Sequence, residues 1–526
     1  MPKPNVAGDP DYCVRNILTL EIINLQPHII LEYVRCCNYQ VLKRLQKRYG
    51  GVYTEQNVIL SGTHTHSTPG GFLMDFLFDL PILGFVKETY AAYIIGIYKS
   101  IVMAHSKLAP ARVEYGEIEI VDANINRSPT SYLRNPPEER AKYKYDTDKT
   151  LAQLRFLSPS NSIIGVINWY AVHPTSMNNT NKLISSDNVG YAAVLMEKAL
   201  NGNNTQPGKG NIVCAFASTN LGDVSPNTRG PRCEFSRAVC DQESLLCKGK
   251  NERCFASGPG RDMFDSTRMI ATKLFEGAMK VLEQPGEDVT SGPVGMVHQF
   301  VEMPKQEAYV FDPLTDTFNT MKFPYEWQPR VVSCSVARVG GALLAAVPGE
   351  FTTMSGRRMR RLLASTASTA GATHVILAGL SNVYSDYIAT YQEYQAQRYE
   401  AASTIFGPHT LEIYLNKYKE LTEALLNVSG HPRNSIRHGR TYMTVEKLVS
   451  EQDDAWTVVA TDADWDTKYI WKRNSKILGT SEAEVEWEIP EGTPPGTYRL
   501  HHYGNYKYIL GGIYPYHGFS DSFEVT

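Results

Sequence analysis

The 526-residue sequence has no long hydrophobic run and no excess of charge of either sign. Its most apolar stretch, Tyr90–Ile101, contains Gly96 and Lys99 and is shorter than the roughly 20 residues that a membrane-spanning helix needs. Because its apolar residues recur at helical spacing, we expect a helix of a protein core. The formal net charge of -3 provides no basic surface for nucleic acid. We therefore expect no nucleic-acid partner and no transmembrane span in this chain.

The sequence also begins without a charged region followed by an apolar one, which a signal segment would have. The cysteines nevertheless favour an oxidising compartment, because four of the nine recur at an even interval, at Cys233, Cys240, Cys247 and Cys254. Charged or small residues separate them, which is typical of a loop held by two short disulfides. The alternative is a zinc knuckle, although cysteine pairs in zinc sites usually have a closer spacing.

Three possible N-glycosylation sites are compatible with secretion, at Asn178, Asn203 and Asn427. Such triplets are common by chance, so the cysteines carry more weight. Together they predict a protein of the secretory pathway, extracellular or at the cell surface. The missing signal segment then suggests an incomplete N-terminus.

Strand-like and helical patterns alternate up to about residue 427, which indicates a mixed α/β domain. We expect strands at 113–120, 162–170 and 211–217, two strands within 331–347, and helices at 265–284 and in much of 390–425. A polar and basic linker at 430–440 is followed by short strand-like segments separated by turn residues. These segments predict a small immunoglobulin-like β-sandwich. The expected fold is thus an α/β catalytic domain over residues 1–429 and a β-sandwich over residues 430–526.

Two histidines follow the apolar run Val58–Leu60, in the motif Ser-Gly-Thr-His-Thr-His-Ser at residues 61–67. If this segment is a strand, His64 and His66 point the same way, because alternate side chains share one face. Imidazole suits zinc, and the glycines that follow let the backbone approach a ligand closely. The alternative is a polar loop with two exposed histidines.

Two further polar segments follow predicted strands. His173 and Pro174 end the strand expected at 162–170, and sites in α/β domains gather where strands end. A structural histidine that caps the strand is an equal alternative. Ser225 lies in Asn-Leu-Gly-Asp-Val-Ser-Pro-Asn at residues 220–227, where small and polar residues suit a loop shaped around a ligand. Because it lacks the Gly-x-Ser-x-Gly setting of a nucleophile elbow, the residues alone favour a turn serine.

Five motifs in the same order resemble the neutral ceramidase family. They are the segments around His64 and Ser225, Ser-Asp-Asn-Val-Gly-Tyr at 186–191, Pro-Gly-Glu-Phe-Thr-Thr at 348–353, and the stretch from 382 through Tyr-Glu-Ala-Ala-Ser-Thr at 399–404 to 408. The resemblance extends from about Val41 to the C-terminus. It implies a zinc-dependent amidohydrolase of lipid metabolism that splits ceramide, presented at a membrane or micelle surface, into sphingosine and a fatty acid.

The resemblance implies one catalytic zinc ion held by His64, His173, Glu350 and Tyr387. Two histidines and a carboxylate are a usual catalytic zinc set. A tyrosine ligand is less usual, and no periodicity distinguishes Tyr387 from Tyr384. That choice depends on the resemblance alone.

The resemblance also places His66, Arg127, Tyr399 and Ser225 at the reaction centre. Arg127 and Tyr399 suit the oxyanion that forms when an amide is attacked, and His66 is the candidate acid for the leaving amine. Ser225 could be a nucleophile or could hold a hydroxyl of the substrate. No histidine beside it in the sequence offers an activating base, so we favour substrate binding.

In the C-terminal domain, the resemblance implies a calcium or magnesium site formed by Asp462, Asp464 and Thr467. Carboxylates and a hydroxyl are the hard oxygen ligands that these ions require. The alternative is a solvated acidic turn.

The chain departs from the family in length. The family's opening strands are not recognisable before about Val41, and segments 300–327 and 430–444 are shorter than in relatives. A β-sandwich that lacks strands exposes unpaired edges, so such a chain could keep its ligands and still misfold. Alternative functions are therefore a truncated, non-catalytic protein that binds zinc or lipid, or an amidase for other N-acyl lipids. A peptidase would more often have His-Glu-x-x-His, which is absent.

Overall fold

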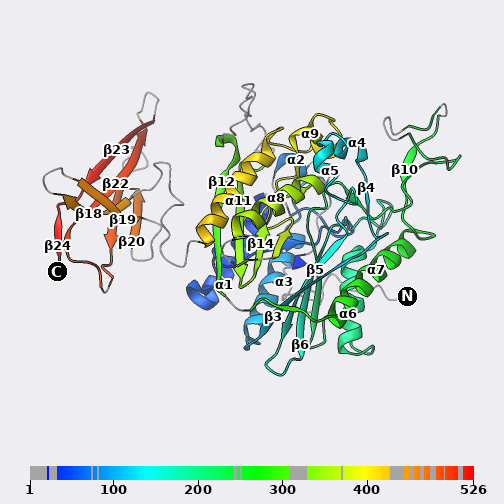
Figure 1. Ribbon diagram of the computed structural model, residues 1–526, viewed down its shortest axis with the longest axis horizontal. Helices are drawn as coiled ribbons and strands as arrows, with labels where there is room; N and C mark the ends of the chain where they lie inside the picture. The colour runs from blue at the N-terminus through cyan, green and yellow to red at the C-terminus, as the bar shows by residue number, and fades with distance from the viewer. Residues whose placement is uncertain are drawn as a thin grey trace. The chain divides into compact units, whose positions relative to one another are not determined.

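The computed structural model describes residues 21–22, 32–72, 75–79, 82–241, 246–248, 251–290, 292–306, 328–368, 371–372, 374–426, 443–450, 455–461, 467–473, 481–490, 492–507 and 513–526. The chain divides into two units, Met1–Leu426 and Asn427–Thr526 (Figure 1). Each unit is described by itself.

The first sheet of the larger unit has five strands in the order β11-β3-β5-β6-β7. They are β11 (Glu287–Asp288), β3 (Arg112–Glu119), β5 (Thr150–Leu157), β6 (Ile163–Tyr170) and β7 (Val213–Ser218). Neighbours run antiparallel except for β6 and β7, which are parallel. Helices α6 (Asp187–Asn201) and α7 (Met263–Glu283) pack beside this sheet (Figure 1). Ile270, Leu274 and Ala278 of α7 are fully buried there, as their helical spacing predicts.

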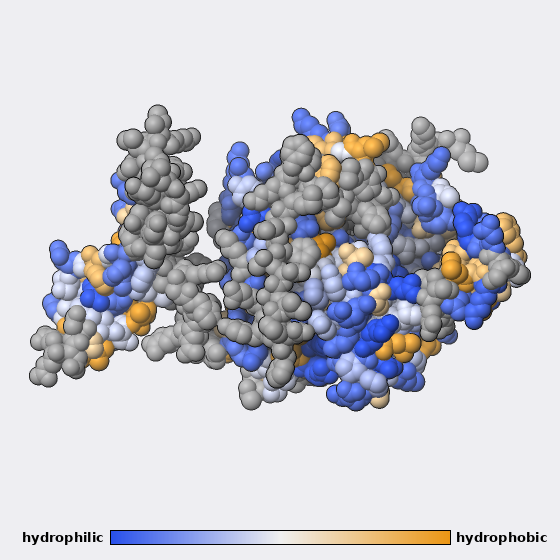
Figure 2. Space-filling view, turned by 90° about the horizontal axis from the view of Figure 1, so that it is seen from above, coloured by the Kyte–Doolittle hydropathy of each residue, from blue (hydrophilic) through white to orange (hydrophobic). Residues whose placement is uncertain are grey.

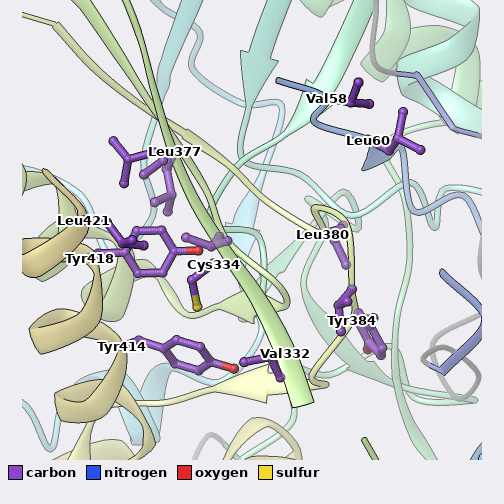
Figure 3. Close-up of a cluster of buried hydrophobic side chains, with 14 of the residues drawn as sticks. Val58, Leu60, Val332, Cys334, Leu377, Leu380, Tyr384, Tyr414, Tyr418 and Leu421 are labelled. Atoms are coloured by element: carbon purple, nitrogen blue, oxygen red, sulfur yellow. The ribbon is translucent and has the colours of Figure 1, made fainter. Parts of the chain in front are cut away.

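The second sheet has four strands in the order β12-β13-β14-β16. They are β12 (Val294–Glu302), β13 (Val331–Val339), β14 (Ala342–Ala346) and β16 (His374–Ala378). Helices α8 (Thr353–Ala367) and α11 (Thr410–Leu426) pack beside this sheet. Tyr414 and Tyr418 of α11 point toward Val332 and Cys334 of β13 (Figure 3).

The two sheets share a hydrophobic core. Trp169 and Ala217 of the first sheet belong to the same buried cluster as Leu344 and Ile376 of the second. Strand β6 is therefore enclosed by this core and by the core under α6 and α7, which explains its nearly continuous apolar sequence. The larger unit is thus a mixed α/β fold with helices, two sheets and helices in successive layers, as predicted in outline.

The remaining elements of the larger unit are short or lie outside the sheets. They are β1 (Glu21–Ile22), α1 (Glu32–Tyr49), η1 (Gly50–Val52), β2 (Ser61–Gly62), α2 (Phe76–Asp79), α3 (Lys87–His105), β4 (Ile125–Asn126), α4 (Pro129–Tyr132), α5 (Pro137–Arg140), β8 (Val224–Ser225), β9 (Pro231–Cys233), β10 (Cys254–Ala256), η3 (Met303–Lys305), β15 (Glu350–Phe351), β17 (Tyr387–Ile388), α9 (Tyr391–Tyr394) and α10 (Tyr399–Ala402). The predicted core helix is confirmed in α3, which buries Ile94, Ile97 and Ile101. Among the described residues, no helix has the length and apolar character to cross a membrane.

The four evenly spaced cysteines form two disulfides, Cys233–Cys247 and Cys240–Cys254. Cys233 and Cys254 also stand opposite each other in the antiparallel pairing of β9 and β10, without being bonded to each other. The predicted disulfides are therefore confirmed, and these sulfurs are not the ligands of a zinc knuckle.

The C-terminal unit is rich in β-structure. Strands β19 (Ala455–Thr461), β18 (Met443–Ser450), β22 (Gly496–Lys507) and β23 (Ile513–Phe519) form one antiparallel sheet, and β24 (Phe523–Val525) also pairs with β22. A hairpin of β20 (Thr467–Arg473) and β21 (Ser481–Trp487) adds Trp487 to the core around Met443 and Tyr498. The β-rich character is confirmed, and the immunoglobulin-like arrangement stays a prediction.

The surface mixes polar and apolar residues. On the face shown in Figure 2, hydrophobic patches lie scattered among hydrophilic residues. Large exposed apolar side chains include Leu83, Leu183 and Phe235. Scattered exposure of this kind is normal for a folded protein, so it does not by itself mark a binding surface.

Candidate active site

The four predicted zinc ligands come from separate segments that meet where strands of both sheets end. His64 follows β2, and His173 lies three residues beyond the end of β6. Glu350 begins β15 shortly after β14 ends, and it stands directly opposite Tyr387, the first residue of β17, in a parallel pairing. His173 and Glu350 therefore lie just beyond strand ends, where sites gather in α/β domains, and their role as a site stays a prediction.

A carboxylate lies between two imidazoles at the centre of this cluster. Nε2 of His64 is 3.0 Å from Oε1 of Glu350, and Nε2 of His173 is 2.9 Å from Oε2. All three side chains are fully buried. The two nitrogens and Oε2 make no hydrogen bond in the described part of the chain. A buried polar atom without a partner costs about 1–3 kcal/mol, so their convergence fits a bound cation that would satisfy all of them.

His173 is oriented as metal ligands usually are. Its Nδ1 lies 2.7 Å from the carbonyl oxygen of Val224 and donates a proton to it, which leaves the lone pair of Nε2 facing Glu350. Burial lowers the pKa of His173 to about 4. The ring is therefore neutral near pH 7, the form that coordinates a metal.

The motif at 186–191 supports this histidine from behind. Asp187, at the start of α6, accepts hydrogen bonds from the backbone N–H groups of Ser176 and Met177, at 3.2 and 3.0 Å. Nδ2 of Asn188 donates to the carbonyl oxygen of His173 at 3.2 Å. Burial raises the pKa of Asp187 to about 6. The motif thus holds the loop that follows His173.

His64 and His66 were predicted to point the same way because they would lie on one strand. The two rings do lie close together, but the predicted strand is wrong. Residues 63–67 form no strand, and His64 has φ 69°, in the left-handed region. The ring centroids of His64 and His66 lie 4.7 Å apart. A turn of the backbone, rather than strand alternation, therefore brings them together.

Exposure separates the predicted ligands from Arg127, Tyr399 and His66. Tyr387 is fully buried, like the histidines and Glu350. The side chain of Arg127 is 27% exposed and Tyr399 is 42% exposed, while His66 is partly buried. The guanidinium carbon of Arg127 lies 5.2 Å from the ring centre of Tyr399. The predicted metal ligands are thus shielded from solvent, and the cluster reaches solvent beside Arg127 and Tyr399.

Ser225 is buried next to this cluster. It lies in β8, opposite Ile125 of β4, and its neighbour Val224 holds His173. Its Oγ accepts a hydrogen bond from the N–H of Asn227 at 3.1 Å. Within the described residues, no histidine hydrogen-bonds to this hydroxyl. Its placement fits a substrate contact and provides no base for a nucleophile.

Two residues of the site were not assigned a role from the sequence. Oη of Tyr384 donates to Oε1 of Glu350 at 2.6 Å, and Glu400 binds Arg127 through its carboxylate. The sequence signal for Glu400 was its position next to Tyr399 in a matched motif. The signal for Tyr384 was its place in the stretch that begins at 382.

Two predictions concern residues elsewhere. Asp462 and Asp464 lie outside the described residues. Thr467 is buried at the start of β20, and its hydroxyl donates to the carbonyl oxygen of Thr461 at 2.6 Å. The cation site in the C-terminal unit therefore stays a prediction.

A buried cluster of two histidines and a glutamate, open on one side at the strand ends of an α/β fold, defines the class of metal-dependent hydrolases. The family model described as "Neutral/alkaline non-lysosomal ceramidase, N-terminal" matches residues 27–320 and 312–416, and the model of the C-terminal part of the same family matches residues 418–525. The chain belongs to the neutral/alkaline non-lysosomal ceramidase family.

Individual relatives agree with this assignment. A neutral ceramidase of Drosophila pseudoobscura pseudoobscura is 42% identical over 613 aligned residues, which cover 92% of this chain and 87% of the relative. Neutral ceramidase B of Dictyostelium discoideum is 35% identical, with 92% and 84% covered. The crystal structure of a neutral ceramidase from Pseudomonas aeruginosa matches with a TM-score of 0.63 at 30% identity, covering 95% of this chain and 90% of that chain. A structure titled as a ceramidase complexed with C2 gives the same score and identity, with 93% and 89% covered.

Proposed function

We propose that this protein is a ceramidase that hydrolyses the N-acyl amide of ceramide to sphingosine and a free fatty acid. The buried cluster of His64, His173 and Glu350 carries this proposal, because its side chains suit a hydrolytic metal site and the chain belongs to the ceramidase family. Relatives named neutral ceramidase support the substrate. A non-catalytic role is less favoured, since each predicted ligand is present and converges.

We propose zinc as the metal, with Tyr387 as the fourth protein ligand. Two histidines, a carboxylate and an open side suit catalytic zinc. When bound, zinc polarises the amide carbonyl and activates a water molecule near neutral pH. Burial and the Glu350 carboxylate raise the pKa of Tyr387, and Arg127 opposes them. The Arg127 guanidinium thus favours negative charge on the phenol oxygen.

The residues at the open side suit the other needs of amide hydrolysis. Arg127 and Tyr399 can donate hydrogen bonds to the oxygen that gains negative charge when the carbonyl is attacked. His66 is our candidate proton carrier to the leaving nitrogen. Burial and the neighbouring imidazoles of His64 and His173 lower the pKa of His66. It therefore starts neutral and must accept the proton that it later gives to the amine.

Ser225 is proposed to bind a hydroxyl of the substrate headgroup. Its side chain is buried beside the cluster, and it has no histidine partner among the described residues. The alternative is a covalent acyl-serine, which would need an activating base. The two roles differ in whether an acyl group is ever bonded to the protein.

Several further features belong to the same proposal. The catalytic domain spans residues 1–429, and residues 430–526 form an immunoglobulin-like sandwich with a calcium or magnesium site at Asp462, Asp464 and Thr467. The protein is a secreted or cell-surface glycoprotein that meets ceramide at a membrane or micelle surface. The two disulfides support an oxidising compartment, and exposed Asn178 and Asn203 are accessible for glycosylation.

The test is hydrolysis of ceramide by the purified 526-residue chain, with zinc measured in the same sample. Release of sphingosine with about one zinc per chain is the expected result. Zinc without turnover would favour the non-catalytic alternative. Turnover of other N-acyl lipids in preference to ceramide would correct the substrate.

A further inference from the structure

Building on the proposed function, we propose that Glu400 is a positioning residue that aims Arg127 at Tyr387 and at the reacting amide. Among the described residues, the carboxylate of Glu400 hydrogen-bonds to Arg127 and Ser128 and to none of the predicted metal ligands. It acts through Arg127, which lies against the predicted ligand Tyr387 and against Tyr399.

The carboxylate of Glu400 uses both oxygens on adjacent residues. Oε1 accepts from Nε of Arg127 at 2.8 Å, and Oε2 accepts from the hydroxyl of Ser128 at 2.6 Å. Glu400 is 2% exposed, whereas the side chain of Arg127 is 27% exposed. The anchor is thus fixed inside the protein while the guanidinium reaches the open side.

This anchor determines which N–H groups of Arg127 remain to donate hydrogen bonds to the substrate. Nη2 donates to the phenol oxygen of Tyr387 at 3.1 Å. A guanidinium is planar and rigid, so fixing Nε and Nη2 fixes the direction of its other N–H groups. Tyr399, which precedes Glu400 in α10, lies beside the same guanidinium. Helix α10 therefore supplies both the anchor and the second proposed donor to the oxyanion.

A double-mutant cycle tests this role, with kcat and KM measured on a soluble short-chain ceramide and zinc measured in each sample. We expect Glu400→Gln to lower kcat about 10–100-fold, the usual effect of losing an orienting partner, with zinc content unchanged. In the Arg127→Ala background the same substitution should cost less than about twofold, because its target is gone. Glu400→Asp, which keeps the charge, should recover part of the loss.

Glu393→Gln is the matched control. Glu393 is a buried carboxylate of the neighbouring helix α9 that accepts from Thr352, Thr390 and Asn135. Its substitution should act on stability and not through Arg127. Any loss of activity from Glu393→Gln should therefore be the same in the wild-type and Arg127→Ala backgrounds. Equal losses from Glu400→Gln in both backgrounds, or full activity of the single variant, would overturn the proposal.

A crystal structure of the Glu400→Gln chain gives a readout that does not depend on turnover. We expect Arg127 to leave the phenol oxygen of Tyr387. If Arg127 stays within hydrogen-bond distance of Tyr387, the proposal is wrong even where ceramide hydrolysis itself is confirmed. If the wild-type chain fails to hydrolyse ceramide while Arg127 moves as expected, the proposed function fails and the positioning role stands.

Should Glu400→Gln not fold, Ser128→Ala removes one partner of Glu400 and should give a smaller loss of kcat. That loss should also vanish in the Arg127→Ala background.

Discussion

Glu350 and Tyr387 stand opposite each other in the parallel pairing of β15 and β17. Tyr384 also reaches Glu350, but it donates its phenol proton to Oε1 of that carboxylate at 2.6 Å. The phenol oxygen of Tyr387 instead accepts from Arg127. We therefore propose that Tyr387 offers its oxygen to the metal and that Tyr384 orients the carboxylate.

Phenylalanine substitutions distinguish these two roles. We expect Tyr387→Phe to weaken zinc binding more than Tyr384→Phe, because only the first removes an atom proposed to touch the metal. For Tyr384→Phe, the loss of an orienting hydrogen bond predicts a decrease of about 10–100-fold in zinc affinity or activity. Competition with a chelator of known affinity measures both. A greater loss of zinc in Tyr384→Phe would reverse the assignment.

His64→Ala tests the proposed metal site itself. The imidazole faces Glu350 at 3.0 Å in a fully buried position, so its removal takes away one ligand and leaves a cavity. Zinc retention and ceramide hydrolysis should be lost together. His409→Ala is a suitable control, since His409 stacks on Tyr391 and is not part of the cluster. Full activity of His64→Ala would rule out the proposed ligand set.

The sequence pattern could predict the regular elements but not the contacts between them. The helix at 263–283 and the strand at 112–119 have hydrophobic periodicities that match their burial, and the strand at 163–170 is apolar almost throughout because both its faces are buried. All three were predicted to within a few residues. The disulfide loop was predicted because its spacing is a local property. The opposition of Glu350 and Tyr387 arises from pairing of distant segments, which no local periodicity encodes.

The roles of individual side chains were hardest to predict. The left-handed φ of His64 has no signal in the motif, because such a backbone is held by the surrounding fold. Glu400 and Arg127 are far apart in sequence, and their contact depends on how α10 packs near β17. Only the resemblance to a family pointed to these segments, and it named neither contact.

Gly222→Ala should disturb the proposed metal site through the backbone that carries Glu350. A Cβ at Gly222 would lie 2.8 Å from the carbonyl oxygen of Glu350 and 3.0 Å from that of Phe351. Because both contacts are backbone atoms, the strand that carries Glu350 must shift. We expect reduced zinc affinity and activity. Gly51→Ala is the control, since nothing lies within 4 Å of its Cβ. Equal activity of both variants would show that β15 can shift away from the added Cβ without loss of activity.

Ser225→Ala separates substrate binding from covalent catalysis. If the hydroxyl holds the headgroup, KM should rise, with a loss of about 0.5–1.5 kcal/mol per neutral hydrogen bond in kcat/KM. If the serine is the nucleophile, hydrolysis should stop. Rapid acid quench of the wild-type chain with acyl-labelled ceramide gives a direct answer. A labelled acyl group recovered on Ser225 would show that our preference is wrong.

The stability of the larger unit should depend on pH through His298, which lies away from the candidate site in β12. Burial lowers the pKa of His298 to about 4, and its Nε2 lies 2.9 Å from Oγ of Ser333. The unfolded chain holds this proton up to about pH 6.5, whereas the folded chain releases it above about pH 4. Between these values the unfolded state binds more protons, so the folded state loses stability as the pH falls. The slope for one group is at most about 1.4 kcal/mol per pH unit. We therefore expect His298→Gln to melt with a smaller decrease between pH 7 and pH 5 than the wild-type chain, with both proteins metal-loaded. An equal decrease in both would mean that the folded chain accommodates the protonated ring.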